Sequence, residues 1–119
     1  MAETPVIDPQ AIENLRALNP GDEDAFLREI VGIFLEDTPQ RLAELEQSLA
    51  TADLPKFTRA AHSIKGSSAN LGAMALREVA EKLEHQSRVS GLGEVAGLLA
   101  ALKAEYGRAE AELAKLAAK

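Results

Sequence analysis

The stretch LPKFTRAAHSIKGSSANLG, residues 54–72, reads as one amphipathic helix with a start and a stop signal. Asp53 stands before it as an N-cap, Pro55 is tolerated in the first turn, and Gly72 is suited to ending it. Successive residues of a helix are rotated by about 100°, and at this spacing five residues fall on one side of the helix and form a stripe that we expect to be buried. Its members are Phe57, Ala61, Ile64, Ser68 and Leu71. This pattern predicts that one face of the helix packs against other helices.

Four further helices are predicted on both sides of this stretch. They cover residues 9–18, 23–52, 73–89 and 94–117, and each has apolar residues at helical spacing. Asp8 and Asp22 are the expected N-caps of the first two. Thr38 and Pro39 leave two alternatives for residues 23–52, a kinked continuous helix or a new helix that starts there. We favour the kinked continuous helix.

The composition supports an all-α fold. Strong helix formers dominate the 119 residues, and aromatic residues make up only 3%. Four long helices with short connections predict an antiparallel up-down four-helix bundle with an aliphatic core. The short helix at residues 9–18 is expected to lie across one end. The whole chain, 1–119, is expected to be a single domain.

Charge and composition exclude several classes of function. The net charge of −6 argues against nucleic acid as a partner. The absence of cysteine excludes disulfides, thiol catalysis and thiolate zinc sites. No apolar run approaches membrane-spanning length, so no membrane partner and a cytoplasmic location are expected. The two histidines have no convergent acids, and no metal site is predicted.

His62 is expected to project into solvent, because it falls about 140° from Phe57 on the helix. Gly66 falls at about 180°, on the outer face, although a helical glycine costs about 1 kcal/mol relative to alanine. The bare backbone at Gly66 predicts open space beside the ring. Lys65, about one turn beyond the histidine, brings a positive charge to the same place.

These residue types fit phosphoryl transfer. A neutral imidazole is a nucleophile near physiological pH, and a phosphoryl group attached to it carries about two negative charges. Lys65 would neutralise part of that charge. No glycine-rich nucleotide loop or second base is visible, so a partner would have to drive the transfer. The alternative is that His62 is simply a solvated residue.

The segment AHSIKGSSANLGAMALREVAEKLE also resembles the histidine-containing phosphotransfer family. The matching positions of its central motif are His62, Ile64, Lys65, Gly66, Ser67, Ser68, Leu71 and Gly72. The resemblance extends over about residues 5–115. It implies a helical bundle whose exposed histidine is phosphorylated on Nε2 and exchanges phosphate with the aspartate of a receiver domain.

The resemblance implies a role for each matching residue. His62 is the expected phosphoacceptor, Lys65 the stabilising cation and Gly66 the residue that leaves room for the phosphate. Glu84 aligns with a polar position that hydrogen-bonds the imidazole in some members, and Arg88 is expected to balance its charge. The expected partners are a response-regulator receiver domain or a hybrid histidine kinase. The receiver supplies Mg²⁺, and the chain itself needs no cofactor and is expected to be a monomer.

A docking surface for the receiver is predicted around His62. The candidate residues are Ile12, Leu15, Phe26, Ile30, Thr58, Arg59 and Ala69. The apolar members could instead hold the short first helix in place. His85, the other histidine, points away from the core and has no comparable neighbourhood, so we interpret it as solvated surface.

Three functions compete at this stage. The leading hypothesis is a phosphorelay intermediate that carries phosphate without being an enzyme. The second is the dimerisation and phosphoacceptor region of a sensor kinase, which would carry a different residue pattern after the histidine. The third is a helical adaptor with an incidental surface histidine, and Gly66 beside His62 argues against it.

Overall fold

The structure is a computed structural model that describes residues 4–117. Five helices follow one another along the chain. They are α1 (Pro9–Leu18), α2 (Ala25–Ala50), α3 (Leu54–Asn70), α4 (Met74–Ser90) and α5 (Ala96–Ala117). Within residues 4–117 there is no β-strand, which confirms the all-α prediction.

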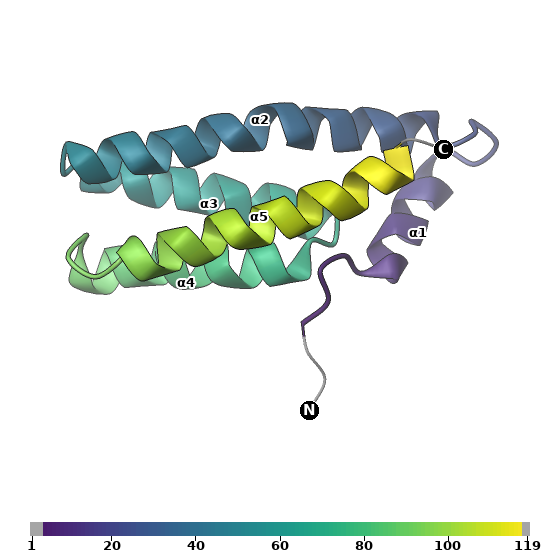
Figure 1. Cartoon of the computed structure of the whole chain (residues 1–119). Helices are drawn as coiled ribbons and strands as arrows, with labels where there is room; N and C mark the ends of the chain where they lie inside the picture. Colours follow the sequence, from purple (N-terminus) through teal and green to yellow (C-terminus); the bar gives the residue numbers. More distant parts are fainter. Residues whose placement is uncertain (1–3, 118–119) are drawn as a thin grey trace.

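Helices α2 to α5 form the predicted up-down bundle. Each packs against two others, since α3 lies between α2 and α4 while α5 closes the ring between α4 and α2. Figure 1 shows α1 crossing one end of the bundle. The largest fully buried side chains include Leu27, Leu45, Phe57, Ile64 and Leu102. The core is aliphatic because each helix turns its apolar stripe inward.

The caps explain where the helices begin. Asp8 Oδ1 accepts from the backbone N–H of Gln10 at 3.0 Å, and Asp53 Oδ1 accepts from that of Lys56 at 3.2 Å. Asp22 is not the N-cap of α2 as predicted, because Asp24 holds that position and its side chain makes no capping hydrogen bond. Oδ2 of Asp22 still accepts from the N–H of Phe26 in the first turn at 2.9 Å. Helix α2 begins at Ala25 rather than at residue 23, since Glu23 and Asp24 both have positive φ.

Other boundaries differ by one or two residues from the sequence prediction. Helix α2 ends at Ala50, close to Ala52, whose positive φ of 57° is incompatible with a right-handed helix. Helix α5 begins at Ala96, two residues after the predicted start. These shifts leave the buried stripes unchanged.

Pro39 lies inside α2, which continues through it as one helix from Ala25 to Ala50. Proline has no backbone N–H, so the carbonyl of Leu35 loses its usual helical donor. The hydroxyl of Tyr106 on α5 lies 3.5 Å from that carbonyl oxygen and donates to it. The Phe34 and Tyr106 rings also pack, with centroids 5.9 Å apart. Helix α5 therefore supplies a hydrogen-bond donor to the carbonyl group that the proline leaves without its helical partner.

Gly72 ties the N-terminal segment to the bundle. The N–H of Asp8 donates to the carbonyl of Gly72 at 2.7 Å, and the N–H of Ala75 donates to that of Pro5 at 3.0 Å. Gly72 has a φ of +69°, and a Cβ there would lie 2.5 Å from Cβ of Ala11. Glycine is required at this turn by both its conformation and its close contact with α1.

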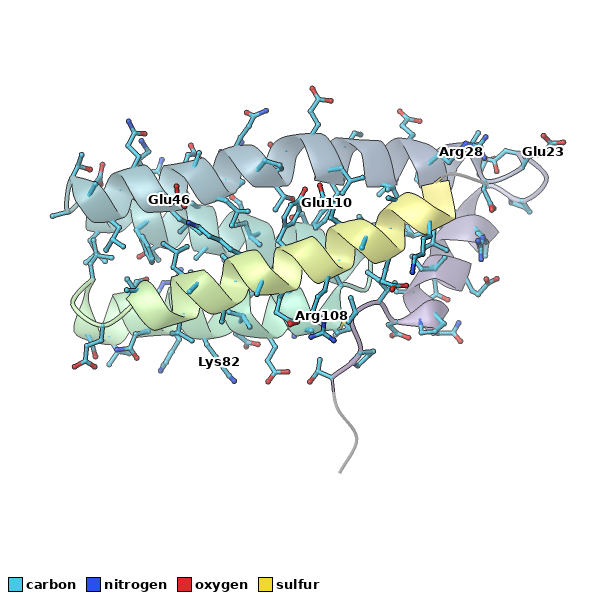
Figure 2. The ribbon with its side chains drawn as sticks, in the orientation of Figure 1. Glu23, Arg28, Glu46, Lys82, Arg108 and Glu110 are labelled. Atoms are coloured by element: carbon cyan, nitrogen blue, oxygen red, sulfur yellow. The ribbon has the colours of Figure 1, made fainter. Side chains whose placement is uncertain are left out.

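Several ion pairs lie on the outside of the bundle. Figure 2 shows Glu46 on α2 where that helix faces α5, and it pairs there with Lys103. Arg41 pairs with Asp37 and Glu44 along α2. Exposed pairs of this kind contribute typically less than about 1 kcal/mol each, so the buried core is the main source of stability.

Candidate functional site

His62 lies on the outer side of α3, as the sequence predicts. Its side chain is 61% exposed, whereas Phe57, Ala61 and Ile64 on the opposite side are fully buried. The buried side chains fix the rotation of α3 and thereby hold the imidazole at the surface. Within residues 4–117, no side chain or backbone group hydrogen-bonds Nε2 of His62.

Gly66 leaves the space beside the imidazole open. The residue is exposed, and a Cβ placed on it would meet no atom within 4 Å. Tight packing therefore does not explain this glycine. A partner or a transferred group can approach the ring over the bare backbone of α3.

Glu84 on α4 is the centre of the site. Its side chain is only 3% exposed, and its Oε2 lies 2.9 Å from Nδ1 of His62. The same oxygen accepts from Nη2 of Arg88 at 2.8 Å, and Oε1 lies 2.7 Å from Nζ of Lys65. One buried carboxylate thus holds the imidazole and both neighbouring cations.

The contact with Glu84 defines the tautomer of His62. An ionised carboxylate only accepts hydrogen bonds, so Nδ1 must carry the proton that it shares with Oε2. The lone pair of the neutral ring then lies on Nε2, which faces solvent. The nucleophilic atom and the accessible atom are therefore the same nitrogen.

The pKa of Glu84 reflects two opposing influences. Burial by itself raises the pKa of this carboxyl group, but the hydrogen bonds from Lys65 and His62 outweigh burial. The net result is a pKa below the ordinary value of 4.5. Glu84 is consequently ionised at neutral pH, as the tautomer assignment requires.

Lys65 brings its positive charge to the site through Glu84, the carboxylate that also bonds His62. Its side chain is 27% exposed and is turned to Glu84 rather than to Nε2 of His62. Arg88 is more exposed, at 62%, and confirms the expectation that it balances Glu84. Both cations are within reach of the histidine while their charge is held by one carboxylate.

The first-helix residues of the predicted docking surface need a correction. Ile12 is only 3% exposed and belongs to the core, so the prediction of a surface role for it is wrong. Leu15 is half-buried and packs against the same core. The bond from Asp8 to Gly72 places the start of α1 past the end of α3, ten residues after His62 in the sequence.

The other predicted docking residues remain at the surface to different degrees. Phe26 and Ile30 are half-buried on α2, whereas Arg59 and Ala69 are exposed on α3. Thr58 is half-buried, and its Oγ1 shares a hydrogen bond of 2.8 Å with Oγ of Ser87. The sequence prediction omitted Ile33, which is 57% exposed on the same strip of α2.

A groove opens beside His62 toward the start of α3. Its lining residues are Leu54, Pro55, Thr58, Arg59, His62 and Arg88. The groove is cationic although the chain as a whole carries a net charge of −6. Arg88 and Leu54 were absent from the predicted docking surface. Leu54 begins α3 and Arg88 lies near the end of α4, so only the antiparallel packing of the two helices brings them together.

The burial of Glu84 was the main feature that the sequence reading missed. A signal was available, since Ala80 and Ser87, four residues before and three after it, both lie on the buried face of α4. His85 is exposed, as predicted. Among residues 4–117 there is no cluster of acids and histidines able to hold a metal ion. None of the helices described is long and apolar enough to cross a membrane.

A helical bundle with an exposed, carboxylate-bonded histidine is the arrangement expected of a phosphotransfer domain. The family model of the Hpt domain matches residues 29–112, which include α3, α4 and the cluster formed by His62, Lys65, Gly66, Glu84 and Arg88. The chain belongs to the Hpt domain family. The resemblance expected from the central motif is thereby confirmed.

The similar proteins agree with this assignment. Multistep phosphorelay regulator 1 of Schizosaccharomyces pombe is 32% identical over 80 residues, which are 67% of this chain and 27% of that protein. This chain thus spans about a quarter of its relative. Histidine-containing phosphotransfer protein B of Pseudomonas aeruginosa has the same fold, with a TM-score of 0.86, 24% identity and coverage of 97% and 96% of the two chains.

A histidine-containing phosphotransfer protein of Medicago truncatula is also similar in fold. Its TM-score is 0.81 at 23% identity, with coverage of 93% of this chain and 76% of that chain. At these identities the solved structures support the fold alone. They confirm the helical bundle predicted from the sequence.

Proposed function

We propose that this chain is a phosphorelay intermediate that takes up a phosphoryl group on Nε2 of His62. The observation that carries the proposal is the bond between Nδ1 of His62 and the buried Glu84, which in the neutral ring places the lone pair on Nε2, on the solvent side. Membership of the Hpt domain family supports the same reaction.

The transfer step follows from this arrangement. The lone pair of Nε2 attacks the phosphorus of an aspartyl phosphate on a receiver domain. The new P–N bond forms as the P–O bond to the aspartate breaks, and the electron pair leaves with the carboxylate. The proton stays on Nδ1, where Glu84 accepts its hydrogen bond. The reverse sequence returns the phosphoryl group to a receiver.

The remaining chemistry belongs to the partner in this proposal. The chain acts as a stoichiometric carrier rather than as an enzyme, with no cofactor of its own, and Mg²⁺ is held by the acidic pocket of the receiver. The partners are a receiver domain of a response regulator or of a hybrid histidine kinase. The carrier works as a monomer in the cytoplasm. The relative's name, which refers to a multistep phosphorelay, supports this class of partner.

The docking surface is proposed to follow the outer sides of α2 and α3. Phe26, Ile30 and Ile33 supply apolar area, and Gly66 and Ala69 supply flat, accessible backbone near His62. An interface of standard size buries about 800 Å² per partner and can span this strip. Half-buried Phe26 and Ile30 would then contribute through their exposed edges.

The test is transfer of radiolabelled phosphate from a phosphorylated receiver domain. Wild-type protein should acquire label that is stable in base and labile in acid, as expected of a phosphohistidine. His62→Gln should acquire none, whereas His85→Gln, which alters the other exposed histidine, should be labelled like wild type. Label on His62→Gln would refute the choice of residue. Absence of label on wild type with several receivers would favour the helical adaptor.

A further inference from the structure

The carboxylate of Glu84 holds both cations of the site before any phosphate is present. Lys65 binds Oε1 at 2.7 Å, and Arg88 binds Oε2 at 2.8 Å. Since Glu84 is 3% exposed, water contributes little to satisfying its charge. The two cations and the imidazole N–H are therefore its principal partners within the described residues.

A phosphoryl group on Nε2 would change this balance of charge. It carries about two negative charges and needs cations nearby. Lys65 follows His62 by three residues on α3, and Arg88 is exposed beside the groove that His62 lines. The ammonium of Lys65 and one guanidinium nitrogen of Arg88 already bind Glu84, so an N–H that turns to the phosphoryl group is withdrawn from the carboxylate. Glu84 and the phosphoryl group thus compete for the same two cations.

Glu84 also acts on the leaving group. While Nδ1 keeps its proton, the departing histidine is a neutral imidazole; without that proton it would leave as an imidazolate anion. The hydrogen bond at 2.9 Å to a charged carboxylate favours the protonated form. The competition for cations and the retained proton therefore both weaken the P–N bond, compared with a site that has an uncharged residue at position 84.

We propose that Glu84 is a positioning residue that makes phosphorylated His62 a strong phosphoryl donor, by withholding Lys65 and Arg88 from the phosphoryl group and keeping Nδ1 protonated. This inference rests on the proposed function of His62. It adds that the residue at position 84 determines the direction in which phosphate flows. A neutral amide there should produce a carrier that retains phosphate.

The experiment uses potassium phosphoramidate, which phosphorylates accessible imidazoles chemically and so requires no receiver. The N–P bond of the donor breaks as the bond to Nε2 forms, and ammonia leaves. After the donor is removed, the half-life of the phosphohistidine is followed by ³¹P NMR and intact mass at neutral pH. Glu84→Gln should lengthen this half-life by about fivefold to tenfold, the size expected of removing one nearby charge.

Glu81→Gln is the matched control. Glu81 lies one turn earlier on α4, is exposed, and pairs with Arg77 rather than with the site. This variant removes the same charge from the same helix and should keep the wild-type half-life. An equal change in both variants would show a general effect of net charge and would overturn the proposal.

Arg88→Gln gives a second, independent readout. It should shorten the half-life, and more strongly in the Glu84→Gln background, where Arg88 is fully available to the phosphoryl group. Equal effects in both backgrounds would refute competition for the cation. An unchanged or shorter half-life in Glu84→Gln would refute the proposal while leaving His62 as phosphoacceptor. Failure of wild-type His62 to become phosphorylated would overturn the phosphoacceptor assignment itself.

Discussion

Nδ1 of His62 on α3 and Oε2 of Glu84 on α4 lie 2.9 Å apart, although 22 residues separate them in the sequence. The pair joins a histidine side chain that is 61% exposed to a carboxylate that is only 3% exposed. The histidine is thereby oriented from the inner side of the site while its reactive nitrogen stays accessible. The properties of the site follow from this contact.

Glu84 should make the stability of the protein depend on acid. Because its folded-state pKa lies below the ordinary value of 4.5, its contribution is present above that value and is lost as the pH falls through the folded pKa. At neutral pH, Glu84→Gln should lower the free energy of unfolding by about 1–2 kcal/mol. Urea denaturation at several pH values should show this difference shrinking as the pH falls below 4.5 and through the folded pKa. A difference that grows in acid would contradict the sign of the shift.

Gly66 should be a functional rather than a structural glycine. Gly66→Ala should raise the free energy of unfolding by about 1 kcal/mol, because a Cβ meets open space and alanine is the better helix former. Gly66→Leu should remain folded but slow phosphoryl transfer by about tenfold or more, since the partner is displaced from the ring. Thermal denaturation and transfer kinetics measure the two effects.

Gly107 provides the control for this prediction. It is an exposed glycine of α5, where a Cβ would also meet nothing within 4 Å. Helix α5 packs against α2 and α4, on the other side of the bundle from α3. Gly107→Leu should leave transfer unchanged. A marked loss of transfer in Gly107→Leu would show that the effect at Gly66 is not local.

Gly72 should behave in the opposite way from Gly66. Gly72→Ala places a Cβ 2.5 Å from that of Ala11 at a φ of +69°, so it should destabilise the protein by about 2–4 kcal/mol. Gly21 also has a positive φ, of +87°, but open space around it. Gly21→Ala should therefore cost only about 1–2 kcal/mol. Equal losses in chemical denaturation would show that contact with α1 contributes nothing at Gly72.

Tyr106 should titrate far above an ordinary tyrosine. Burial, with a smaller contribution from the charge of Glu110, raises the pKa of its hydroxyl to about 12. Stability linked to this group is present below the ordinary value of 10.0 and is lost as the pH rises through the folded pKa. Tyr106 is the only tyrosine and the chain has no tryptophan, so tyrosinate absorbance reports it alone. A midpoint near 10 in folded protein would contradict its burial against α2.

Much of this architecture was predictable because helical periodicity is a local property. The spacing of Phe57, Ala61 and Ile64 alone placed His62 in solvent and Gly66 on the open face, and both positions are confirmed. The caps at Asp8 and Asp53 are likewise local, since they require only bonds to residues two or three positions away.

The sequence by itself therefore determined the class of fold, the helices and the outward face that carries the histidine. Only the tertiary structure decided that Glu84 is buried, that Lys65 and Arg88 converge on it, and that Ile12 belongs to the core. The physical reason is that these features depend on how each helix is rotated and shifted against its neighbours. Side-chain packing across the whole bundle sets that registration, and no single helix encodes it.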